Sequence, residues 1–131
     1  MQIEIIDEAQ KLDSEQIQLL EKIIAHALET ETGRSDFEVS LTITDNENIR
    51  QINKEYRDMD KETDVLSFPL INFQADENPW QNPENFNPES GEIMLGDIVI
   101  SYEKAVAQAQ EYGHTLNREL CYLCVHSVMH L

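Results

Sequence analysis

Apolar and polar residues alternate in several short runs of this chain, a period of two that is typical of half-buried β-strands. In the clearest run, four apolar residues share one face of the predicted strand: Phe37, Val39, Leu41 and Ile43. The same alternation predicts three further strands, over residues 2–6, 65–68 and 92–101. Pro69 is expected to end the strand at 65–68, because proline cannot donate to a sheet ladder. Gly96 is a candidate for a β-bulge.

Between these runs the apolar positions recur every three to four residues, which predicts four helices. Each predicted start has a residue that can cap the first turn: Asp13, Thr44, Ser101 and Thr115. Asp13 and Gln16 have the spacing of a capping box, in which each side chain bonds the other residue's N–H. Thr44 and Glu47 have the same spacing. Gly33 is expected to end the first helix, because glycine readily takes the left-handed C-cap conformation.

Strands and helices follow one another along the chain, which predicts an α/β or α+β fold in which a small mixed sheet packs with helices. A chain of 131 residues is expected to form a single compact domain. Residues 72–91 are rich in asparagine, proline and glutamate, and we expect them to form a long loop.

The formal net charge of -17 speaks against non-specific binding to nucleic acid or to anionic membranes. The sequence shows no signal peptide and no apolar run of membrane-spanning length, so a cytoplasmic location is expected. Two cysteines are too few for a secreted disulfide scaffold of this size, which agrees with a reducing compartment.

Four of the nine basic residues lie close together, at spacings that put them on one side of a helix: Arg50, Lys54, Arg57 and Lys61. We call these residues the basic cluster. Their arrangement fits an ordinary solvated helix face as well as a local binding site for a nucleic-acid backbone.

His126 and His130 are four residues apart on the last predicted helix, which places both imidazoles on one face, close enough to share a metal ion. Two exposed surface histidines would give the same pattern. Cys121 and Cys124 precede the pair, and the resulting order C-x-x-C followed by H-x-x-x-H matches the ligand order of a Cys2His2 zinc site. At about 100° per residue, however, both cysteines point well over 100° away from the histidines. We therefore expect the cysteines to pack in the core.

Helical zinc proteases use an H-E-x-x-H motif in which the glutamate after the first histidine is the general base. Here that position is Ser127, which cannot take this role at neutral pH. A peptidase of that class is not expected.

The segment "HSVMHL" resembles the start of the H-G-x-L-H-L-x-G-Y-D-H signature of the YbeY endoribonucleases, ribosomal RNA maturation factors of bacteria. Three more segments match the family in order and spacing: "NKEYRDMDKETDVLSFPL", "LGDIVIS" and "YGHTLNREL". Ser127 departs from the usual glycine of the signature, but it keeps a small residue there.

The resemblance implies a single-strand-specific, metal-dependent endoribonuclease in ribosomal RNA processing and ribosome quality control, with zinc as its one metal ion. It implies His126 and His130 as metal ligands and Arg57 as the catalytic arginine of the family's basic site. Thr63, Asp64 and Ser67 match the neighbouring loop. The basic cluster would then track single-stranded ribosomal RNA, and the ribosome and its proteins are expected partners. His126, His130 and Arg57 are expected to face one concave surface.

The family's third metal histidine lies six residues beyond the second, whereas the printed sequence ends one residue after His130. We therefore expect the chain of residues 1–131 to be a single endoribonuclease domain that is truncated within its metal motif. Catalysis by a zinc-activated water and catalysis by Arg57 with the RNA's own 2′-hydroxyl both remain open. Two other functions also remain: a non-catalytic RNA-binding assembly factor, and a metal-dependent hydrolase of another substrate.

Overall fold

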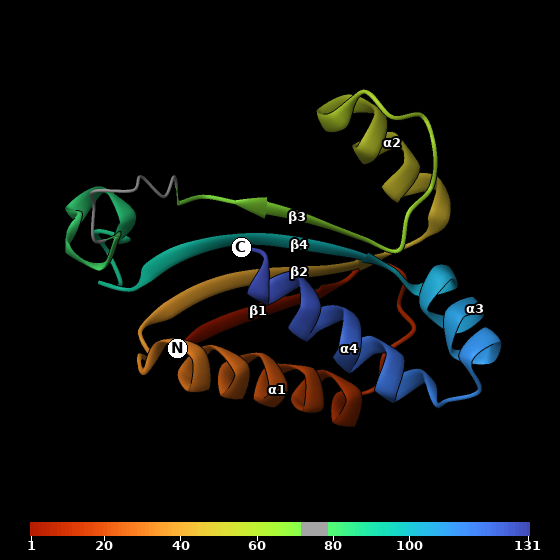
Figure 1. The fold of residues 1–131 in the computed structure, drawn as a ribbon, viewed down its shortest axis with the longest axis horizontal. Coiled ribbons are helices and arrows are strands. Elements are labelled where there is room, and N and C mark those ends of the chain that lie inside the picture. Colours follow the sequence, from red (N-terminus) through yellow and green to blue (C-terminus); the bar gives the residue numbers. More distant parts are fainter. Residues whose placement is uncertain (72–78) are drawn as a thin grey trace.

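The structure, a computed structural model, describes residues 1–71 and 79–131, which contain a four-stranded sheet (Figure 1). In spatial order its strands are β1 (Gln2–Asp7), β2 (Phe37–Thr44), β4 (Ile93–Ser101) and β3 (Val65–Pro69). β1, β2 and β4 run parallel, and β3 lies antiparallel to β4 at one edge. This confirms the small mixed sheet that the alternation predicts.

The helices of the described residues are α1 (Ser14–Thr32), α2 (Asn46–Arg57), α3 (Tyr102–Tyr112) and α4 (Leu116–Met129). Two short 3-10 helices, η1 (Pro79–Gln81) and η2 (Pro83–Asn85), precede β4. No helix within the described ranges is long and apolar enough to cross a membrane.

The two faces of the sheet carry different helices (Figure 1). α1 and α4 pack on one face, where Ile98 and Ile100 of β4 are fully buried together with Leu123 of α4. α2 packs on the other face at the β3–β4 edge, where Leu66 of β3 pairs with Val99 of β4 beneath the helix. Successive strand residues point to opposite faces, so β4 is buried on both sides where α2 and α4 lie.

The predicted cap of α1 is confirmed: Asp13 and Gln16 form a capping box, and Gly33 ends the helix in the left-handed conformation. The predicted cap of α2 is wrong by one residue. Asp45 is the N-cap, and its carboxylate accepts a hydrogen bond from the Asn48 N–H at 2.8 Å. Thr44 cannot take this role because it is still the last residue of β2 and is buried there.

The predicted bulge is confirmed beside Gly96. Glu38 pairs with Met94 and Val39 with Gly96, so Leu95 is an extra residue in β4. At Gly96, which has a φ of 150°, a Cβ atom would lie 2.4 Å from the Phe68 carbonyl oxygen. Only glycine allows this approach of β3.

Residues 72–78 of the expected long loop lie outside the described residues. The residues that follow, from 79 on, pack against one end of the sheet. The Trp80 ring packs edge-on against the buried Phe37, with centroids 5.6 Å apart, and Phe86 forms a bridge to Ile93.

Candidate functional site

His126 and His130 project from exposed positions near the end of α4. Their rings meet edge to face, with centroids 4.5 Å apart. One turn of helix separates the two residues, which is why their side chains fall on the same side. The pair thus places two imidazoles close together on one side of the helix, an arrangement that half of a zinc site requires.

The two histidines suit a zinc ion in donor type, since imidazole nitrogen is a common zinc ligand. In residues 1–71 and 79–131 no group of three histidine, cysteine or acidic side chains is placed to hold a metal. The residues present therefore fit two corners of a metal site, and a third protein ligand is required to complete it.

The cysteines lie elsewhere, as the sequence predicts. Cys124 is fully buried in the main core, and Cys121 is half-buried against it. Burial raises the pKa of both thiols. A neutral, buried thiol is a packing group, because the thiolate is the form that binds metal.

The histidines lie on the flank of α4 that faces away from α1. The opposite flank is marked by Asn117, whose side-chain oxygen accepts a hydrogen bond from Gln16 of α1 at 2.9 Å. His126 follows Asn117 by nine residues, which is a rotation of about 180° around the helix. Since α4 also packs against β3, the imidazoles lie on the side of this edge strand.

Arg57 is the last residue of α2 and is exposed. Its guanidinium makes no ion pair or hydrogen bond with the described residues. Because α2 and α4 pack on opposite faces of the sheet, Arg57 and the histidines can meet only around the edge strand β3.

A chain of contacts across β3 links the two groups. Tyr56, next to Arg57, packs edge-on against Phe68 of β3, with ring centroids 5.5 Å apart. A Cβ atom at Gly96 would lie 2.4 Å from the Phe68 carbonyl oxygen and 3.0 Å from the side chain of Leu131, the residue after His130, so both groups border the same space beside Gly96. The expected common surface would therefore straddle the β3 edge.

The basic cluster is less uniform than its spacing predicts. α2 ends at Arg57, so Lys61 lies beyond the helix and is not part of its face. Asp60 accepts a hydrogen bond from Arg50 at 2.7 Å and lies 3.9 Å from the Lys54 ammonium. The guanidinium of Arg50 lowers the pKa of the Asp60 carboxyl, which stays charged. Part of the positive charge of the cluster is thereby neutralised within the chain.

Asp64, in the loop before β3, is engaged in local structure. Its carboxylate accepts a hydrogen bond from the Val65 N–H at 2.8 Å and another from Gln108 of α3 at 3.3 Å. Its carbonyl accepts one from the Ser101 N–H. These bonds favour a turn-forming role for Asp64.

Tyr122 is given no role by the sequence pattern, yet the structure stacks it on the histidine pair. Its ring lies 5.8 Å from that of His126, with only 14° between the planes. An aromatic residue four positions before the first histidine is the signal from which this contact follows.

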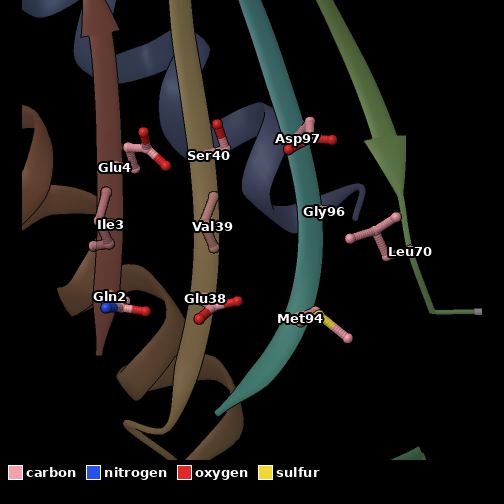
Figure 2. Close-up of a pocket in the computed structure, with 10 residues that line it drawn as sticks. All are labelled: Gln2, Ile3, Glu4, Glu38, Val39, Ser40, Leu70, Met94, Gly96 and Asp97. Atoms are coloured by element: carbon pink, nitrogen blue, oxygen red, sulfur yellow. The ribbon is translucent and has the colours of Figure 1, made fainter. Parts of the chain in front are cut away.

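A groove of about 630 Å³ lies on the sheet face that α2 leaves open (Figure 2). Acidic side chains from three strands line it: Glu4 of β1, Glu38 of β2 and Asp97 of β4. Neither the histidines nor the basic cluster contributes to its lining. Its negative charge makes this groove unsuitable for a polyanion.

Comparison with known proteins gives consistent matches. The family model described as Endoribonuclease YbeY matches residues 2–131. A protein named endoribonuclease YbeY from Agathobacter rectalis is 47% identical over 85% of this chain and 70% of its own length. Another of that name, from Thermoanaerobacter sp. strain X514, is 46% identical over 100% of this chain and 82% of its own length. A solution structure of TM1509 from Thermotoga maritima has a similar fold, with a TM-score of 0.64 at 23% identity over 98% of this chain and 71% of that one.

Proposed function

The chain belongs to the endoribonuclease YbeY family, and on this basis we propose that it is a metal-dependent endoribonuclease in ribosomal RNA maturation. It is a hydrolase that cuts phosphodiester bonds within RNA. We further assign it single-stranded ribosomal RNA as substrate, a part in ribosome quality control, the cytoplasm as location, and the ribosome and its proteins as partners.

The single observation that carries the proposal is the pairing of His126 and His130 on the β3 side of α4. These residues would hold one zinc ion through two imidazole nitrogens. The family motif puts a third histidine six positions after His130, which would supply the remaining protein ligand. When bound, the zinc would act as a Lewis acid and lower the pKa of a coordinated water.

Arg57 would bind the phosphate group of the phosphodiester that is cleaved. Cleavage of a phosphodiester builds negative charge on its non-bridging oxygens, and a planar guanidinium can donate two parallel hydrogen bonds to them. The guanidinium is exposed and has no carboxylate partner in the described residues, so it is free to bind this group. Arg50 and Lys54 lie on the same helix and, with Lys61, would contact neighbouring phosphates.

The test is cleavage of matched single-stranded and double-stranded RNA, with and without chelator, by a variant extended to place a histidine six positions after His130 and by the His126→Ala form of that variant. We expect cleavage of the single strand alone, lost with chelator and in the variant. RNA binding without cleavage under all conditions would instead identify an assembly factor. Cleavage unaffected by chelator would contradict the metal-dependent reaction.

A further inference from the structure

Exposed side chains recur every four positions along α4 and at its C-cap: Arg118, Tyr122, His126 and His130. We call these four residues the α4 row. The positions between them carry the buried side of the helix: Glu119, Leu120, Leu123, Cys124, Ser127 and Val128. With a rise of 1.5 Å per residue, neighbours in the row are about 6 Å apart along the helix axis. The row therefore continues the surface of the histidine pair over three turns of helix.

Among the described residues, no carboxylate neutralises Arg118, a cation on a strongly acidic chain. Two of the four arginines are held by carboxylates, Arg34 by Asp36 at 2.6 Å and Arg50 by Asp60 at 2.7 Å. The guanidinium of Arg118, by contrast, has no hydrogen bond or ion pair with the described residues. A free guanidinium is a preferred partner for phosphate.

The acidic residue next to Arg118 does not compete for it. Glu119 is 1% exposed, and its carboxylate lies 2.5 Å from His114 Nε2, on the buried side of α4. Arg118 projects from the exposed side. The charge of Arg118 thus remains available at the surface.

Tyr122 provides a flat aromatic surface beside the histidines. The residue is 60% exposed although it is large and apolar. Its ring is nearly parallel to that of His126, so the two form a short stack that ends at the His126–His130 pair. Exposed aromatic rings next to unpaired cations are the combination with which proteins bind single-stranded nucleic acid.

We propose that Arg118 and Tyr122 form an RNA-binding subsite, in which Arg118 binds a backbone phosphate and Tyr122 stacks on a base adjacent to the histidine pair. This inference rests on the proposed function. The RNA would run along the exposed flank of α4 and would avoid the acidic groove of Glu4, Glu38 and Asp97 on the other side of the sheet. Stacking needs an unpaired base, so the subsite selects single strands.

The first experiment measures binding of a short fluorescein-labelled single-stranded oligoribonucleotide by fluorescence anisotropy, in chelator so that the RNA stays intact. Tyr122→Leu is expected to weaken binding about 5- to 150-fold, the usual effect of losing one stacked base. Tyr122→Phe should bind within about twofold of the parent, since it keeps the ring. In chelator, a role of Tyr122 confined to orienting His126 toward a metal would leave RNA binding unchanged, and that result would overturn the stacking role.

The second experiment repeats the titration over a range of salt concentrations. Arg118→Gln should bind more weakly and should reduce the slope of log affinity against log salt by about 0.7, the value for one phosphate contact in a single strand. Arg118→Lys should keep most of the slope, because it keeps the charge. An unchanged slope in Arg118→Gln would overturn the phosphate contact.

Matched controls come from the same chain. Tyr112→Leu removes another exposed tyrosine, 64% exposed on α3, and Lys22→Gln removes an exposed cation of α1. Both should bind RNA as the parent does.

A parent that cleaves RNA while the Arg118 and Tyr122 variants bind normally would reject the subsite alone. If the parent does not bind RNA, and the chain extended to carry a histidine six positions after His130 does not cleave it, the proposed function is rejected as well.

Discussion

The imidazole rings of His126 and His130 lie edge to face, with centroids 4.5 Å apart, and Ser127, which follows the first histidine, lies on the buried side of the same helix. Ser127 is 1% exposed, and its hydroxyl donates to the Leu123 carbonyl at 2.7 Å. The family signature has glycine at this position, and serine fits because its only polar group is satisfied within the helix. Ser127 thus packs on the buried side of α4, while His126 and His130 lie on its exposed side.

Replacing Arg57 tests its catalytic role. Arg57→Ala is expected to lower the rate of RNA cleavage on the order of a hundredfold, because a cation that stabilises developing phosphate charge is lost. Arg57 is exposed and unpaired among the described residues, so the melting temperature should stay close to that of the parent. Arg57→Lys should recover only part of the rate, since it lacks the planar fork. A parental cleavage rate in Arg57→Ala would remove Arg57 from the mechanism.

Replacing Asp60 tests the basic cluster by a change that is expected to strengthen RNA binding. Asp60→Asn should strengthen RNA binding a few-fold, because it releases Arg50 and Lys54 from a competing carboxylate. The matched control is Asp36→Asn, which frees Arg34 at a distance from α2 along the chain and should leave RNA affinity unchanged. Anisotropy titrations of the three proteins make the comparison. Weaker binding by Asp60→Asn would show that Asp60 orders the cluster for RNA and does not mask it.

Local periodicity was enough to predict the strands and helices, since each depends on neighbours a few residues away. The wrong prediction of Thr44 as the N-cap of α2 shows the limit of prediction from local periodicity. Thr44 and Asp45 are both good caps, and the choice depends on how far β2 continues, which pairing with β4 sets. Lys61 likewise follows the helical spacing, but the chain leaves the helix at Asp58, in the left-handed conformation.

The relation between Arg57 and the histidines was beyond sequence reasoning for a different reason. Whether α2 and α4 share a face depends on the order of the strands and on β3 lying at the edge. That order is a property of long-range pairing, and no short window of sequence contains it. The Tyr122–His126 stack, by contrast, is a four-residue contact and was open to prediction from spacing.

Gly96 is expected to be the least replaceable glycine. Gly96→Ala should lower the free energy of unfolding by about 2–3 kcal/mol, because the new Cβ would meet the Phe68 carbonyl oxygen at 2.4 Å and Leu131 at 3.0 Å. Gly33→Ala is the control, since its Cβ would meet nothing within 4 Å and only the left-handed φ of 70° adds strain, about 1 kcal/mol. Chemical denaturation measures both. Equal losses would mean that the close approach at β3 relaxes without cost.

The two cysteines are expected to differ in reactivity. Native protein treated with iodoacetamide at mildly alkaline pH should leave Cys124 unmodified, because burial raises its pKa and keeps the thiol neutral and covered. The half-buried Cys121 should react slowly. Mass spectrometry locates the label, and unfolded protein provides the control in which both react. Protection of Cys121 by added zinc would contradict its assignment to packing.

The metal site is tested by adding a third histidine to the chain. Two histidines hold zinc much less tightly than three, since each further ligand adds binding free energy without another large ordering cost. Residues 1–131 are therefore expected to bind zinc weakly. A variant extended to place a histidine six positions after His130 should bind tightly and melt at higher temperature. Zinc at about 100 times its Kd stabilises a protein by about 2.7 kcal/mol. Replacing His126 or His130 by alanine in the extended chain should abolish that gain. Equal zinc affinity in the two chains would mean that a third ligand already lies within residues 1–131.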